Sequence, residues 1–102
     1  MEQGGWIFPR LDYYVNKGIH TGSRLLTDKR DYSREMRYRV SREEDHLHVF
    51  IWRGPYSFEK SEMLFQNDFA LDRDGVQAAH DWIMGQYAVL REQEQKLDEM
   101  SS

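Results

Sequence analysis

Two histidines separated by a single residue, His46 and His48, are the side chains of this sequence best placed to bind a metal ion. Residues two apart on a β-strand point to the same face, so the two imidazoles would lie side by side. A carboxylate such as that of Glu44 would have to approach them to provide a third ligand. Because two ligands do not make a metal site, we expect that no metal is bound here.

Catalytic residue types also occur, but without the arrangement that catalysis requires. His80 and Asp81 are adjacent, and the glycine-containing stretch 18–23 holds a histidine and a serine. A Ser/His/Asp triad is defined by its geometry in space, and the stretch lacks both a nucleophile-elbow motif and the ending of a phosphate-binding loop. The absence of cysteine excludes thiolate chemistry. We therefore expect no catalytic residue, no cofactor and no enzymatic activity.

The basic residues are concentrated in the N-terminal part of the chain, where they alternate with aromatic residues. Residues 1–42 contain nine Lys and Arg against five Asp and Glu, a net charge of +4, whereas residues 43–102 contain five against thirteen, a net charge of −8. Basic groups beside exposed aromatic rings are typical of surfaces that bind single-stranded nucleic acid. The densest basic residues are Lys29, Arg30, Arg34, Arg37, Arg39 and Arg42, with Tyr32 and Tyr38 among them.

The same arginines have an interpretation that needs no ligand. Arg37 and Arg39 can cover the rings of Trp52 and Phe50 by cation–π contact, or pair with the acidic C-terminal part of the domain. The overall net charge of −4 also opposes binding to phosphate groups. Nucleic acid is therefore the second hypothesis for the partner. Its contact residues would be Arg34, Arg37, Tyr38, Arg39 and Trp52.

A second group of candidate contact residues surrounds the Gly-Pro pair at 54–55. Trp52, Arg53, Tyr56 and Phe58 are of the types that anchor protein interfaces when they are exposed. The alternative is that Tyr56 and Phe58 fold back and close the end of the core. The sequence leaves both interpretations open.

The elements that position these residues begin with a β-hairpin. Residues 36–41 alternate apolar and basic, and residues 47–53 are rich in branched and aromatic side chains, so both predict strands. With Glu44 and Asp45 at the tip, one face should meet the core and the other should carry arginines and aromatic rings. The expected pairs are Val40 with Val49 and Tyr38 with Ile51 on the core face, and Arg39 with Phe50 and Arg37 with Trp52 on the other.

A third strand and a helix follow the hairpin. The Gly-Pro pair at 54–55 ends the second strand, and alternation over 63–70 predicts another, with its aromatic side chains inward. Beyond it, apolar residues recur every three or four positions, which predicts a helix that begins near Arg73 with Asp72 as its N-cap. The charged segment 91–102 has few apolar residues, so we expect a helical tail there.

The N-terminal third has weaker patterns. Residues 6–9 and 11–15 hold enough apolar side chains for one strand or two short ones, with Pro9 at a sheet edge. Residues 17–24 have the glycines and hydroxyl groups of a turn, and residues 25–33 predict a loop or a single helical turn.

Together these elements predict one α+β domain spanning residues 1–102, with a core at about residues 6–90. We expect a three- to four-stranded, mainly antiparallel sheet packed on one face by a single C-terminal helix. A mean hydropathy of −0.86 is offset by 14% aromatic residues, which bury much surface per residue. A domain this small gains from association, so a homodimer is one hypothesis for its assembly.

The sequence has no apolar run of membrane-spanning length and no signal-peptide pattern at its N-terminus. We expect a cytoplasmic protein with no membrane partner.

Three segments of the chain stand in a recognisable order: Arg37-Tyr38-Arg39, then 49–59 with its Trp and Gly-Pro-Tyr, then Phe69 before a helix that carries Trp82. In this order the chain resembles a group of short uncharacterised proteins of Gram-positive bacteria. The resemblance covers about residues 17–90, and the Trp and Gly-Pro-Tyr stretch is its most specific part. It implies a compact bacterial domain and supplies no site residue.

The sequence thus favours a non-enzymatic protein-interaction or regulatory module with an unidentified protein partner. Binding would use the 52–58 region or the arginine and aromatic face of the hairpin. The candidate contact residues are Arg37, Arg39, Trp52, Arg53, Tyr56 and Phe58.

Overall fold

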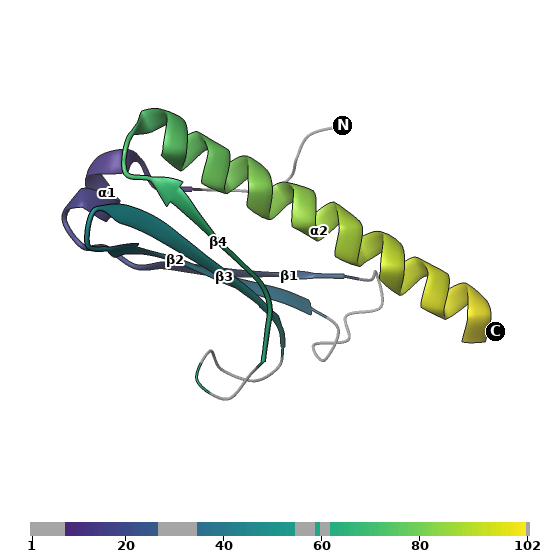
Figure 1. Ribbon diagram of the computed structural model, residues 1–102. Coiled ribbons are helices and arrows are strands. Elements are labelled where there is room, and N and C mark those ends of the chain that lie inside the picture. Colours follow the sequence, from purple (N-terminus) through teal and green to yellow (C-terminus); the bar gives the residue numbers. More distant parts are fainter. Residues whose placement is uncertain (1–7, 27–34, 55–58, 60–61, 102) are drawn as a thin grey trace.

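The computed structural model describes residues 8–26, 35–54, 59 and 62–101. Within them the chain forms a four-stranded antiparallel sheet and a long C-terminal helix that packs against it, which confirms the α+β fold (Figure 1). The elements in chain order are α1 (Leu11–Val15), β1 (His20–Leu25), β2 (Glu35–Glu43), β3 (His46–Arg53), β4 (Met63–Ala70) and α2 (Arg73–Ser101).

The strands follow the chain order β1-β2-β3-β4, and every neighbouring pair is antiparallel. The hairpin of β2 and β3 has the predicted register, with Val40 opposite Val49 and Arg37 opposite Trp52. Its tip is at Glu44 and Asp45, where Glu44 adopts a left-handed conformation with φ of 60°. β4 spans the predicted residues and joins the sheet at the free edge of β3.

The core lies between the sheet and α2. Alternate residues of β2 and β3 turn their apolar side chains towards the helix. They pack against apolar side chains of α2 that are spaced three or four residues apart. Each fully buried aliphatic or aromatic side chain contributes about 1.5–3 kcal/mol to folding. The buried members are Met36, Tyr38, Val40, Leu47, Val49 and Ile51 from the strands, and Val76, Ala79, Ile83 and Leu90 from α2.

Helix α2 begins where the sequence predicts it to begin. The Asp72 carboxylate accepts a hydrogen bond of 2.7 Å from the backbone N–H of Gly75, which is the contact that an N-cap makes. The helix continues without a break to Ser101, and its last turns extend past the ends of the strands (Figure 1). Glu94, which lies in the charged segment, is buried and forms an ion pair with Arg53 of β3. This pair fixes the C-terminal part of the long helix to the sheet.

Two expectations for the N-terminal third are wrong. Residues 11–15 form the short helix α1 and not a strand, because the buried side chain of Tyr14 is held by a contact with His80 of α2. Residues 20–25 form strand β1 where the sequence suggests a turn. Gly22 belongs to this strand because the ring of Tyr38 occupies the space that a side chain would fill. The part of the predicted loop at 27–33 lies outside the described residues.

Neither helix in the described part of the chain has the length and apolar character needed to cross a lipid bilayer.

We predict opposite effects for two substitutions in α2. Gly75 is buried in the first turn, and a Cβ there would collide with the backbone carbonyl of Ala70. Gly75→Ala should therefore lower the free energy of unfolding by about 1–3 kcal/mol. Gly85 is exposed, and a Cβ there meets no atom within 4 Å. Gly85→Ala should therefore raise the free energy of unfolding by up to about 1 kcal/mol. Urea denaturation measures both, and equal effects would contradict the close approach of α2 to β4.

Candidate functional site

The sheet has two unlike faces, and α2 covers only the apolar one. The register places a second set of side chains together on the other side, which we call the far face. The far face carries Thr21 and Ser23 of β1, Arg37, Arg39 and Ser41 of β2, His46, His48, Phe50 and Trp52 of β3, and Gln66 and Asp68 of β4.

The far face brings together three of the six predicted contact residues. Arg37 and Arg39 lie side by side on β2, with Trp52 opposite Arg37 on β3. The Trp52 side chain is only 4% exposed, so its ring is not presented to solvent. The Nε of Arg37 donates a hydrogen bond of 2.7 Å to Oε1 of the buried Glu35, which neutralises part of the charge of this face.

Of the other three predicted contact residues, one lies on the opposite face and two are not among the described residues. Arg53 lies on the helix side of the sheet, where it pairs with Glu94. Tyr56 and Phe58 lie outside the described residues, as does Arg34 of the second hypothesis. The acidic helix therefore pairs with one arginine of the hairpin, while Arg37 and Arg39 stand on the opposite face.

Two connected hollows lie along the β1 and β2 side of the far face. The first, of about 580 Å³, is lined in part by Thr21, Ser23, Arg37 and Trp52. The second, of about 500 Å³, continues towards the hairpin tip and the turn after α1. Both include Ile19 and Arg39, so the hollows form one continuous surface. The second hollow is lined in addition by Lys17, Ser41, Arg42, Glu43 and Glu44.

Exposed apolar side chains gather at the end of this surface. Tyr13, Val15 and Ile19 are 42%, 41% and 49% exposed. The Tyr13 hydroxyl donates a hydrogen bond of 2.7 Å to the carbonyl of Ile19, and Arg42 donates one of 2.8 Å to the carbonyl of Val15. These bonds hold the three apolar residues beside the second hollow. We call Tyr13, Val15, Lys17, Ile19, Arg39 and Arg42 together the α1–β1 patch.

Apart from Arg39, the members of this patch are not among the six contact residues that the sequence predicts. Its apolar members flank a turn in which Lys17 adopts a φ of 66°, and a turn of this kind has no periodic pattern. The sequence does contain one indication of the patch. Val15 and Ile19 flank the polar Asn-Lys-Gly stretch, and apolar residues exposed together at such a turn can mark an interaction site.

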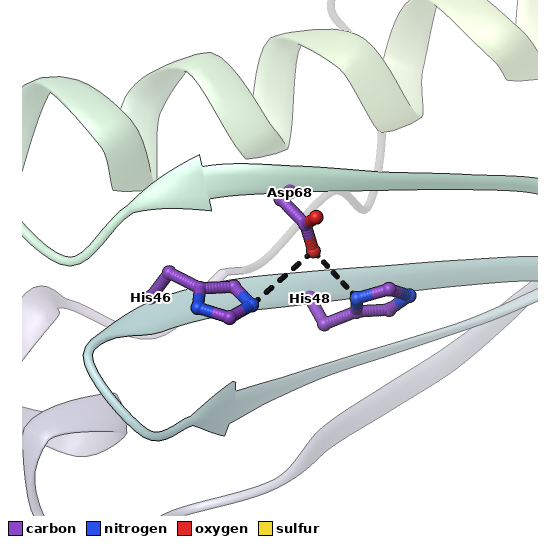
Figure 2. Close-up of side chains that lie close together, drawn as sticks. All are labelled: His46, His48 and Asp68. Carbon is purple, nitrogen blue, oxygen red and sulfur yellow. Dashed lines mark ion pairs between the residues drawn. The ribbon is translucent and has the colours of Figure 1, made fainter.

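The histidine pair has a partner that the sequence analysis did not name. His46 and His48 lie on one face of β3 as predicted, and the carboxylate between them belongs to Asp68 of β4 (Figure 2). Asp68 Oδ1 is 3.4 Å from His46 Nε2 and 2.5 Å from His48 Nδ1. The register pairs His48 with Asp68 directly, so the sheet itself brings the two together.

The remaining two histidines lie in a buried aromatic cluster. His80 of α2 stacks on Phe8 with ring centroids 4.0 Å apart, and its Nε2 is 3.2 Å from the hydroxyl of Tyr14. His20 of β1 lies against Phe8 and Tyr38. Burial lowers the pKa of His80 to about 4, with a further contribution from His20 that outweighs the opposing effect of Asp81.

Burial favours the uncharged forms of the titratable rings in this cluster. Burial also lowers the pKa of His20 and raises the pKa values of Tyr14 and Tyr38, so all four groups are neutral at pH 7. Neutral aromatic rings can share an apolar site without the cost of burying charge. The cluster joins α1, β1, β2 and α2.

Comparison with known proteins adds no assignment: no protein-family model, curated protein or solved structure matches the chain significantly. The function must therefore be argued from the surfaces described above.

We predict that His80 makes stability depend on pH in acid. The unfolded chain binds a proton on His80 below pH 6.5, whereas the folded chain does so only near pH 4. The stability that neutral His80 provides is complete above pH 6.5 and is lost as the pH falls to 4, by about 3 kcal/mol. Urea denaturation of the wild type and of His80→Gln from pH 8 to pH 4 measures this loss.

At pH 8, the difference in the free energy of unfolding between the two proteins gives the cost of the substitution itself. The change in this difference at lower pH then measures the effect of protonating His80. His80→Gln should approach or overtake the wild type as the pH falls. A constant difference across the range would show that burial does not perturb His80.

Proposed function

We propose that this protein is a non-enzymatic interaction module that binds a protein partner through the α1–β1 patch. The partner segment would place apolar side chains over Val15 and Ile19 and carboxylates beside Lys17, Arg39 and Arg42. The single observation that carries the proposal is the gathering of three exposed apolar residues beside a continuous hollow in which basic side chains outnumber carboxylates.

The composition of the patch supports a protein partner. Aromatic, aliphatic and arginine side chains are enriched at the centre of protein interfaces, where their removal from water provides most of the binding energy. Half of the six exposed large apolar side chains in the described part of the chain lie in this patch: Tyr13, Val15 and Ile19. The others, Leu64, Val89 and Leu97, lie on β4 and along α2.

The distribution of charge supports an acidic partner segment. The net charge of +4 belongs to residues 1–42, which include all six members of the patch, and the net charge of −8 belongs to residues 43–102. The long acidic helix lies across the opposite face of the sheet. In the second hollow Lys17, Arg39 and Arg42 outnumber Glu43 and Glu44. A carboxylate that approaches the patch therefore meets more positive than negative groups within a Debye length of about 8 Å.

Nucleic acid remains the second hypothesis, with less support than a protein. Binding to single strands needs aromatic rings on which bases can stack and basic groups that can meet phosphates. Trp52 is 4% exposed, and Arg37 shares its charge with Glu35. Unless the far face rearranges, Trp52 has no exposed ring on which a base could stack, and Arg37 is not fully available to pair with a phosphate.

We predict that Ile19→Asp abolishes partner binding while Val89→Asp leaves it intact. Both substitutions put a carboxylate in place of an exposed aliphatic side chain, at 49% and 44% exposure, but only Ile19 belongs to the patch. Tagged wild-type and variant proteins would be used to recover partners from extracts of the source organism, with and without nuclease. Circular dichroism checks that both variants fold.

Proteins that the wild type and Val89→Asp recover, and that Ile19→Asp loses, would support the proposal. Recovery of the same proteins by all three would contradict it, and material lost on nuclease treatment would favour the second hypothesis. Sedimentation of the purified chain tests the homodimer: a dimer that Ile19→Asp dissociates would identify the partner as a second copy.

A further inference from the structure

We infer that His46, His48 and Asp68 form a binding site for a divalent transition-metal ion of the zinc class. One nitrogen of each imidazole and one carboxylate oxygen lie within 4.8 Å of one another. The inference does not depend on the function proposed above, because none of the three residues belongs to the α1–β1 patch.

The sheet fixes the positions of the three side chains. His46 and His48 are two residues apart on β3 and share the far face, and Asp68 is opposite His48 on β4. Figure 2 shows the carboxylate directed at the space between the two rings. Ligands on paired strands are held more rigidly than ligands on loops, which favours a defined coordination geometry.

The outer nitrogens of both rings face oxygen acceptors. His48 Nε2 is 3.1 Å from Oε1 of Gln66, and His46 Nδ1 is 3.5 Å from Oδ1 of Asp45. A histidine that binds a metal commonly donates its other N–H to an oxygen, which sets the tautomer and directs the lone pair to the ion. Here the lone pairs would lie on His48 Nδ1 and His46 Nε2, the two atoms that face Asp68.

The distances from Asp68 to the two histidines are close to those between ligands of a metal ion. Ligands at 2.0–2.1 Å in a tetrahedral site are about 3.3 Å apart. The separation of His46 Nε2 and Asp68 Oδ1 is already 3.4 Å, and that of His48 Nδ1 and Asp68 Oδ1 would open from 2.5 Å. Asp68 is 61% exposed at its side chain, so its carboxylate can rotate and the ion can enter from solvent.

The donor set determines the class of ion. Two imidazoles and one carboxylate suit zinc, nickel, cobalt and copper, whereas calcium and magnesium prefer oxygen alone. Three protein ligands leave at least one position for water or for a group from another molecule. The alternative is that protonated histidines simply pair with Asp68, which uses the same contacts but binds no metal.

Zinc titration of the tag-free, chelator-treated protein tests the site. Isothermal titration calorimetry should give one zinc ion per chain, and cobalt should give the visible absorption of a low-coordinate site. His48→Ala and Asp68→Asn should each weaken zinc binding by about 100-fold or more, and Gln66→Ala, which removes only the acceptor of the His48 N–H, by about 10-fold.

Asp81→Asn is the matched control, since Asp81 is also an exposed carboxylate but lies on α2, which packs on the opposite face of the sheet from the site. It should bind zinc as the wild type does. Zinc affinity that is the same in the wild type and in both His48→Ala and Asp68→Asn would overturn the inference, as would the absence of zinc binding by the wild type. Because Asp68 is exposed, Asp68→Asn tests the site even if His48→Ala fails to fold.

Discussion

The register of the β2–β3 hairpin is the constraint on which the rest of the structure depends. Side chains alternate between the two faces of a strand, so a slip of one residue would exchange every inward and outward group. In the observed register Tyr38 and Val40 face the helix, and Arg37 and Arg39 face away. The opposite arrangement would bury two guanidinium groups under α2, which the core could not compensate. The hairpin thus decides both where the core forms and which chemistry the far face presents.

Helix α2 covers only one of the two faces that this alternation creates, so the two faces of the sheet differ in charge and in the side chains that they expose. It is held at its first turn by the Asp72 cap, along its length by the apolar core and near its end by the Arg53–Glu94 pair. Because it covers the apolar face, Arg37 and Arg39 lie on the other side of the sheet from the helix, while Glu43 and Glu44 of the acidic half line the second hollow. The low net charge of the whole chain therefore says little about either surface. The two surfaces that we consider functional lie towards opposite edges of the far face, one beside β1 and the other between β3 and β4.

The features that the sequence predicts well are those that depend on neighbouring residues. The hairpin follows from alternation and a polar tip, the strand at 63–70 from a second alternating run, and the start of the helix from an aspartate before a helical period. The N-terminal third was predicted wrongly because its structure depends on distant partners. Tyr14 is fixed by His80, and Gly22 is a strand residue because Tyr38 fills the space above it. Nothing within a few residues of either position indicates these contacts.

The sequence by itself determined that two histidines share one face of a strand, that arginines and apolar residues alternate on the hairpin, and that the helix begins at Arg73. Only the tertiary structure decided what lies beside them. β4 supplied Asp68 to the histidines where the sequence offered Glu44, α2 supplied Glu94 as the partner of Arg53, and the turn after α1 set Ile19 beside Arg39. The physical reason is that periodicity and capping act over a few residues, whereas the neighbours of a side chain across a sheet depend on the order and register of strands far apart in the chain.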